Sequence, residues 1–476
     1  MTTKIELHAG DNRETLRRLI DQGVRVHSVV TDPPYGLVSI QKRFGKDSAK
    51  AARTENNDGS FARLSGGFMG KAWDATGIER DPEFWKLIYD ILLPGGYVFA
   101  FSGSRTGHWQ ACAMEMAGFV MHPMHGWCFG SGFPKAHAAD KAIDKMLGAK
   151  GGFVPSGDPV KRMIPGADQH RDGSWIKDNG REYQPGSYVP GSPEAAQWEG
   201  WAYGTQTQKP ALEPIYLGQK PFSEKTGAAN LLKHGVGAVN IDDCRVPIDP
   251  SADASQLRIM QRGQRNEDQN GQEWGMSKNG GDTPTVVRAE GRHPANLILD
   301  GSPEVVAMFP AKAGAAAPVK GTEPSSVTND IYGKFNERVP GTFFGDTGSA
   351  ARFFHQFGPD TDPLIYQAKA GKADRAGSKH PTVKPIALMQ YLIRHITPPG
   401  GTVLDPFAGS GTTAEAARRE GFDCILMEAE LEYVEFLRCR FPETDTEADA
   451  DLAELMGRPQ TRVTEVYDSD LIELFA

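Results

Sequence analysis

Residues 402–413 read Thr-Val-Leu-Asp-Pro-Phe-Ala-Gly-Ser-Gly-Thr-Thr. The first four residues predict a short strand, the glycines predict a tight turn, and the threonines begin a helix that we expect to run to Arg419. Residues 424–427 predict the next strand, which ends at Glu428. Because a helix that joins two strands in this way is typical of a parallel sheet, the stretch predicts a βαβ unit and an α/β fold.

The glycine-rich turn of this unit has the character of a ligand site. Backbone NH groups and a helix N-terminus can approach a ligand there, and the acid that ends the next strand, Glu428, suits a ribose diol. The turn lacks the lysine of a phosphate-binding loop and has only the first half of a dinucleotide motif. The Asp405 carboxylate would repel a pyrophosphate and attract an ammonium. The expected ligand is a nucleoside that carries an amino acid, the outline of S-adenosylmethionine, with other nucleotides as the alternative.

A second carboxylate follows a predicted strand near the start of the chain. Residues 24–30 predict the strand, and the sequence continues Thr-Asp-Pro-Pro-Tyr-Gly. Pro33 and Pro34 have no NH group, so the turn offers acceptors, on Asp32 and on the backbone, without competing donors nearby. Tyr35 adds a flat ring on which a planar group can stack. These features suit an aromatic amine, and the alternative is a plain turn in which Asp32 caps the next segment.

Helix and strand patterns alternate at both ends of the chain. We expect further strands at 5–9, 97–101 and 119–129, and helices at 14–20, 84–93, 108–117, 138–147 and 385–396. Residues 36–77 predict a long loop, of the kind that forms lids or substrate clamps. Residues 148–208 show little periodicity and predict an irregular insertion, 212–217 predicts an edge strand, and 218–360 has the pattern of a separate small domain.

The charge of the chain is concentrated at its C-terminal end. The formal net charge is −9, and residues 441–476 hold ten acidic and two basic residues, which account for eight of these charges. Positive surface must therefore be local. The best candidate for phosphate contact is a basic patch between residues 369 and 384, with a solvated loop as the alternative. It consists of Lys369, Lys372, Arg375, Lys379, His380 and Lys384.

Several classes of protein are not expected. The N-terminus has no apolar signal region, and no run approaches the roughly 18 apolar residues of a membrane span, so we expect an intracellular protein without a membrane partner. The five cysteines are scattered and include no C-x-x-C pair, which indicates free thiols. No group of His, Cys and carboxylate residues has metal-ligand spacing, so no metal is expected.

Together the two carboxylate turns resemble the motifs of a known family. Asp32-Pro33-Pro34-Tyr35, followed far downstream by the turn from Asp405 to Thr412, is similar to the amino-methylating DNA methyltransferases. The order of the motifs, with the catalytic one first, resembles their permuted β class and its long phage and prophage members. The stretch His-Pro-Thr-Val-Lys-Pro at 380–385 matches the lead-in to the family's cofactor motif.

This resemblance implies a fold and a division of the chain. The implied fold is a doubly wound, Rossmann-like methyltransferase fold with an inserted DNA-recognition region. Residues 1–147 and 362–441 would form the catalytic domain, 148–361 the insertion, with recognition mainly in 218–361, and 442–476 an acidic tail. Asp32 and Asp405 would lie at neighbouring carboxyl ends of strands.

The resemblance also implies roles for individual residues. The catalytic residues would be Asp32, Pro33, Pro34 and Tyr35. The cofactor S-adenosylmethionine would be bound by Asp11, Thr382, Lys384, Asp405, Phe407, Gly409, Gly411 and Glu428.

The implied activity is methylation of the exocyclic amino group of adenine (N6) in double-stranded DNA. Asp at the first motif position favours adenine over the N4 position of cytosine, which is the nearest alternative. Methylation of RNA or of a protein glutamine, and a non-catalytic nucleic-acid-binding protein of the same fold, are the others. A cognate restriction endonuclease and a homodimeric state are further expectations, as is a bacterial, phage-encoded cytoplasmic protein.

Overall fold

The computed structural model covers most of the expected catalytic domain and parts of the insertion. The described residues are 3–36, 76–132, 134, 136–158, 160–161, 182–204, 206–247, 291–311, 348–357, 370, 372–378 and 383–442. The predicted loop at 36–77, apart from its ends, and the acidic tail after residue 442 lie outside these ranges. Lys369, Lys379 and His380 of the basic patch also lie outside them.

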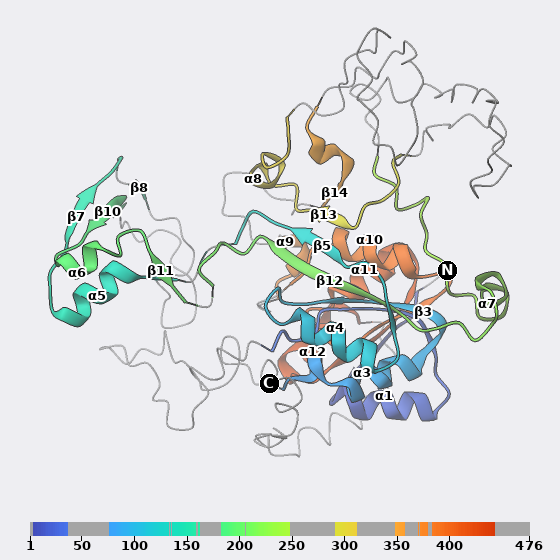
Figure 1. Ribbon diagram of the computed structural model, residues 1–476. Coiled ribbons are helices and arrows are strands. Elements are labelled where there is room, and N and C mark those ends of the chain that lie inside the picture. Colours follow the sequence, from blue (N-terminus) through green and yellow to red (C-terminus); the bar gives the residue numbers. More distant parts are fainter. Residues whose placement is uncertain are drawn as a thin grey trace, which may run out of the picture.

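One ten-stranded sheet organises the chain (Figure 1). Its order is β1-β16-β15-β2-β3-β12-β5-β13-β14, and β4 also pairs with β12. The strands are β1 Ile5–Ala9, β2 Val26–Thr31, β3 Leu92–Phe101, β4 Val120–Met121, β5 His125–Cys128, β12 Leu212–Gln219, β13 Leu297–Leu299, β14 His355–Gln356, β15 Thr402–Asp405 and β16 Asp423–Glu428. Neighbours from β1 to β3 are parallel, and β12 is antiparallel to β3 and β5. Strands from the two ends of the chain therefore interleave.

Helices cover both faces of this sheet, which confirms the predicted doubly wound α/β fold. They are α1 Asn12–Asp21, α3 Pro82–Ile91, α4 Gly107–Met116, α7 Gly227–His234, α10 Ile386–Ile396, α11 Thr412–Glu420 and α12 Leu431–Arg440. One core packs Leu392 of α10 and Val434 of α12 with Phe99 of β3. A second core packs Trp85 of α3 with Val98. Because successive strand residues point to opposite faces, Val98 and Phe99 place one core on each side.

The helices beside the carboxyl edge of the sheet have defined starting points. The Asp11 carboxylate caps α1 and accepts hydrogen bonds from the NH groups of Arg13 and Glu14 at 2.8 and 3.2 Å. Asp81 caps α3 in the same way, and Pro82 occupies the first turn, where no NH donor is needed. Asp11 thus fixes the turn between β1 and α1 that sequence analysis associated with the cofactor.

Two strand predictions in the middle of the chain are wrong. Residues 212–217 do not form an edge strand, because β12 pairs with β3 on one side and with β5 on the other. Residues 119–129 form two short strands rather than one. Pro123, which cannot donate a ladder hydrogen bond, lies in the interruption between β4 and β5.

The expected insertion at 148–361 is not wholly separate from the catalytic domain. Strands β12, β13 and β14 belong to the main sheet, and Ile298 of β13 is fully buried in its core. The prediction of a separate small domain at 218–360 therefore fails for β13 and β14. Local periodicity could not show this, since β13 and β14 are only three and two residues long.

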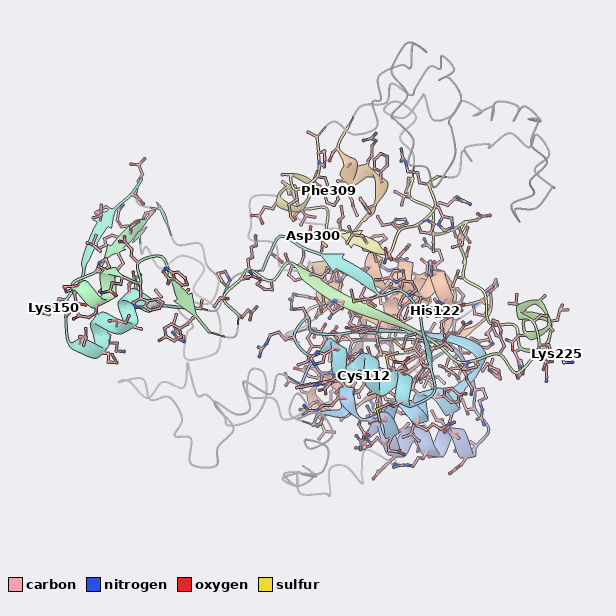
Figure 2. The ribbon with its side chains drawn as sticks, viewed as in Figure 1. Cys112, His122, Lys150, Lys225, Asp300 and Phe309 are labelled. Atoms are coloured by element: carbon pink, nitrogen blue, oxygen red, sulfur yellow. The ribbon has the colours of Figure 1, made fainter. Side chains whose placement is uncertain are left out.

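Residues 137–203 include a lobe apart from the main sheet, at the left of Figure 1. Its elements are β6 His137–Ala138, α5 Ala139–Leu147, β7 Gly152–Pro155, β8 Val160–Lys161, β9 Glu182–Tyr183, β10 Gly186–Val189, α6 Pro193–Ala196 and β11 Ala202–Tyr203. Figure 2 shows Lys150 in this lobe and Cys112 and His122 on the body. The buried Asp144 joins its parts by accepting from Tyr188, Gly191 and Ser192. The prediction of an irregular region at 148–208 is therefore wrong for the parts of it that the structure describes.

The remaining elements are short. They are the 3-10 helices Ile78–Arg80 and Ala350–Phe353, α8 Pro303–Val306 and α9 Lys372–Arg375. Among the described residues, no helix has the length and apolar character to cross a membrane.

Candidate active site

Two parallel strands from opposite ends of the chain bring the two carboxylate turns together. Strands β2 and β15 are paired neighbours, with Ser28 opposite Val403 and Val29 opposite Leu404. Both strands end at the same edge of the sheet, because parallel strands share their direction. The hydroxyl of Thr31 donates to Asp405 Oδ1 at 2.7 Å. The expected proximity of the two turns is confirmed.

The Asp405 carboxylate holds the glycine-rich turn in place. Besides Thr31, it accepts hydrogen bonds from the Thr413 hydroxyl at the start of α11 and from the NH of Phe407, the latter at 3.1 Å. Asp405 is only 2% exposed. Burial raises the pKa of Asp405 to about 6, although these three donors oppose the shift. Asp405 thus ties β15, the turn and α11 to β2.

Glu428 closes the other side of the same turn. Its carboxylate accepts from the NH of Gly409 at 2.7 Å and from the NH of Glu430 at 2.8 Å. Burial raises the pKa of Glu428 to about 7 against these hydrogen bonds. Gly411 precedes α11 with φ of 75°, and a Cβ there would lie 2.5 Å from Leu437. The turn therefore requires glycine at this position.

The N-terminal turn after β1 packs against the glycine-rich turn. The NH of Gly10 donates to the Glu428 carbonyl at 2.9 Å, and the Asn12 side chain donates to the Pro406 carbonyl at 3.1 Å. The Phe407 ring contacts Phe84 of α3, with ring centroids 5.4 Å apart. The structure thus brings together Asp11, Asp405, Phe407, Gly409, Gly411 and Glu428 of the expected cofactor set.

The turn after β2 presents Asp32 and Tyr35 to a set of buried polar groups. The Tyr35 hydroxyl donates to Asp32 Oδ1 at 2.9 Å and also contacts Glu213. The Thr106 hydroxyl donates to the Tyr35 carbonyl at 2.6 Å and holds the turn against the start of α4. Pro33 and Pro34 lie between Asp32 and Tyr35 in this turn.

Lys384 lies in this second group rather than at the glycine-rich turn. Its Nζ contacts Asp32 Oδ2 and lies 3.2 Å from both Glu213 Oε1 and the Tyr35 hydroxyl. The same ammonium is 4.7 Å from the ring centroid of Phe101. Glu213 and Lys384 are 4% and 5% exposed and Asp32 is half-buried, so this is a largely buried network of two carboxylates and one ammonium.

Burial and charge act on this network in opposite directions. Burial raises the pKa of Asp32, Lys384 opposes the shift, and the like charge of Glu213 reinforces it. Burial by itself lowers the pKa of Lys384, but the adjacent Asp32 and Glu213 carboxylates outweigh it and raise that pKa. The pKa of Tyr35 is raised well above its usual value by burial and by the two carboxylates. The lysine is therefore held in its charged form and the tyrosine in its neutral form.

Glu213 was not predicted from the sequence. It lies on β12, 178 residues from its contact Tyr35, and the sequence carries no local motif that connects the two. The one feature of the sequence that could have indicated Glu213 is an acidic residue within the otherwise apolar strand pattern at 212–217. Thr382 lies outside the described residues. No group of three or more His, Cys, Asp or Glu side chains suited to a metal occurs in the part of the chain that the structure describes.

The fold is that of an α/β protein in which these two turns lie side by side at the carboxyl edge of a doubly wound sheet, the edge where such folds bind ligands. A family model described as DNA methylase, of the N6/N4 methyltransferases, matches residues 26–438. Since this match spans most of the length, the chain belongs to the N6/N4 DNA methylase family.

Individual relatives are similar over part of the chain or at low identity. The Type II methyltransferase M2.DpnII of Streptococcus pneumoniae is 44% identical over 69 residues, which are 14% of this chain and 26% of that protein. The crystal structure of the M1.HpyAVI–SAM complex has a TM-score of 0.35 and 14% identity, covering 92% of this chain and 98% of that one. The PvuII DNA methyltransferase (cytosine-N4-specific) has a TM-score of 0.36 and 14% identity, covering 96% and 92%.

The hydrogen bond between Thr31 and Asp405 can be tested by Thr31→Val, which keeps the branched shape. Asp405 Oδ1 loses one of its two donors and keeps the NH of Phe407, so we expect the free energy of unfolding to fall by about 1–3 kcal/mol. Urea unfolding followed by circular dichroism at pH 8, where Asp405 is ionised, measures the change. The matched control is Thr402→Val at the start of β15, for which we expect a change within about 0.5 kcal/mol. Equal losses in both variants would contradict a special role for Thr31.

Proposed function

We propose that the protein transfers a methyl group from S-adenosylmethionine to the N6 amino group of adenine in DNA. The observation that carries the proposal is the link between the Asp32 turn and the glycine-rich turn, made by Thr31 and Asp405 at 2.7 Å. A methyl donor at one turn and an amine at the other would be neighbours. Membership of the N6/N4 DNA methylase family supports this assignment.

The residues of the glycine-rich turn fit a nucleoside that carries an amino acid. Each Glu428 oxygen accepts one backbone NH and keeps a lone pair for a ribose hydroxyl. Gly409 and Gly411 keep side chains away from the turn, Phe407 offers an aromatic face, and Asp11 lies in the adjoining turn. When bound, S-adenosylmethionine supplies an electrophilic methyl group on a sulfonium. Asp405 holds the turn and adds negative charge nearby, which favours a cationic ligand.

The Asp32 turn would bind the amine that receives the methyl group. An aromatic amine is a poor nucleophile, because its lone pair is delocalised into the ring. Hydrogen bonds from its NH groups to the Asp32 carboxylate and the Pro33 carbonyl favour a more tetrahedral nitrogen. Pro34 keeps the turn rigid, and the Tyr35 ring would stack on the base. A base inside a duplex must first be flipped into such a site, at a cost of a few kcal/mol.

Adenine is favoured over cytosine by the residue at position 32. The resemblance described above associates Asp at this position with adenine and Ser with cytosine, and the chain has Asp32. N4 methylation of cytosine is the second candidate, because its amino group has the same geometry. A restriction endonuclease partner and a homodimer remain expectations.

Recognition of a particular DNA sequence is assigned to the insertion at 148–361, mainly to 218–361. Support comes from the position of β12, β13 and β14, which attach this region to the sheet beside Glu213. The basic patch supplies Arg375 in α9 as a candidate phosphate contact.

The methyl-transfer proposal predicts that DNA from cells expressing the protein contains N6-methyladenine. Asp32→Ala should abolish methyl transfer, because the amine loses its acceptor, while binding of S-adenosylmethionine survives. Nucleoside analysis by mass spectrometry and calorimetric titration of the cofactor measure the two properties. Asp90→Ala, at an exposed ion pair with Lys86, is the matched control and should behave as wild type. Retained transfer by Asp32→Ala would refute the catalytic assignment, and N4-methylcytosine would select the second candidate.

The Glu428 assignment predicts a pH dependence of cofactor binding. Ribose hydroxyls donate to the carboxylate, so the ionised form binds better. Since the pKa of Glu428 is raised to about 7, affinity should rise as pH increases from 6 to 8, by up to about tenfold. Glu428→Gln should bind more weakly and lose this component. Glu435→Gln on the exposed side of α12 is the control. Titration of the ligand itself is common to all three proteins, so an identical pH profile in Glu428→Gln would contradict the assignment.

The recognition proposal predicts that the methylated sequence follows the 218–361 region. The region would be exchanged with that of a family member of different specificity, with β12, β13 and β14 kept so that the sheet is intact. We expect the new protein to methylate the donor's sequence, as read by methylation-sensitive sequencing. Exchange of the 137–203 lobe serves as the comparison. An unchanged methylated sequence after the first exchange, together with a changed one after the second, would move recognition to the lobe.

A further inference from the structure

The Asp32 carboxylate has both of its oxygens engaged by the protein itself. Oδ1 accepts from the Tyr35 hydroxyl at 2.9 Å, and Oδ2 contacts the Lys384 ammonium. The proposed substrate amine needs one of these oxygens as an acceptor. A carboxylate oxygen can accept a second hydrogen bond, so the amine by itself need displace neither partner. The Lys384 ammonium, however, also lies over the Tyr35 ring, 5.5 Å from its centroid, and this ring is where the base is proposed to stack. An entering base therefore competes with Lys384 for both the ring and the carboxylate.

Of the three charged groups in the network, Lys384 is the one that can move. Glu213 is fixed by its strand, since β12 pairs with β3 and β5 on either side of it. Asp32 follows directly on β2 and precedes two prolines. Lys384 lies before α10, and its ammonium is carried on a four-carbon side chain with several rotatable bonds. It lies within reach of both carboxylates already.

We propose that Glu213 is a positioning residue that holds Lys384 when Asp32 binds the substrate amine. In the substrate-free protein Lys384 bridges the two carboxylates. On entry of the base it releases Asp32 Oδ2 and stays paired with Glu213, from which it is separated by 3.2 Å. The inference rests on the proposed function, because it takes the amine of a base as the group that replaces Lys384.

The charge of the network explains why a second carboxylate is needed. A buried ammonium without a counterion is strongly unfavourable, and Lys384 is 5% exposed. With Glu213 in place, Lys384 can leave Asp32 and remain neutralised. Without Glu213, Asp32 is the single carboxylate that the structure shows in contact with Lys384, and the amine would compete with a buried ion pair.

The test is a cycle of Glu213→Gln, Lys384→Met and the double variant in the full-length chain. Methyl transfer from tritiated S-adenosylmethionine to unmethylated genomic DNA gives kcat and the KM for DNA, and calorimetry gives cofactor affinity. We expect Glu213→Gln to raise the KM for DNA by roughly tenfold or more, with cofactor affinity unchanged. In the Lys384→Met background the same substitution should not raise the KM, because no ammonium remains and a like charge beside Asp32 is removed.

A control variant and the pattern of results distinguish a failure of the positioning role from a failure of the proposed function. Glu224→Gln, at the surface pair with Lys233, should leave all constants unchanged. An equal effect of Glu213→Gln in both backgrounds, or none in the wild-type background, would overturn the positioning role while wild-type transfer stands. If the wild-type protein transfers no methyl group to DNA, the proposed function fails and the inference fails with it. Thermal unfolding of each variant identifies a change that comes from the fold alone.

Discussion

The site depends on one hydrogen bond between residues that are 374 positions apart, from Thr31 to Asp405. It joins the last residue of β2 to the last residue of β15, the strands at the centre of the interleaved part of the sheet. Both residues are buried, so neither has water as an alternative partner. The two turns can be neighbours only when strands from both ends of the chain have been paired. The proposed ligand site is therefore a property of the assembled sheet and not of either end of the chain alone.

The carboxylates of Asp405 and Glu428 hold the glycine-rich turn, and they are the same groups that we propose to face the ligand. Glu428 and Asp405 accept backbone and hydroxyl donors that define the turn, and their pKa values are raised because burial is only partly compensated. A carboxylate oxygen has two lone pairs, so such a residue can hold its own backbone and still face a ligand. These hydrogen bonds explain why acids occupy the two positions, where an apolar residue would leave donors unpaired.

Features of the fold and the candidate site could be predicted from the sequence where they depend on neighbouring residues, and not where they depend on distant ones. The βαβ unit at 402–428 and the turn at Asp32 could be predicted, because strand, glycine turn and capping residue follow one another directly. The place of β12 could not, since strand neighbours are chosen by pairing across 178 residues and more. Glu213 was missed for the same reason, and Lys384 was grouped with the cofactor residues because its motif lies beside them in sequence. The short strands β13 and β14 carry too few residues for a periodic pattern.

The pairing of β5 with β12 has a consequence for how this chain can vary. Cys128 at the end of β5 lies opposite Leu212 at the start of β12. The chain thus leaves the sheet after Cys128 and returns to it at Leu212, at adjacent points, as in a hairpin, and the described parts of the 137–203 lobe belong to this connection. Lengthening such a loop costs little free energy and leaves the strand register unchanged. Glu213 directly follows Leu212, where the chain returns to the sheet. A connection of any length between β5 and β12 therefore leaves this carboxylate at the same place beside Asp32.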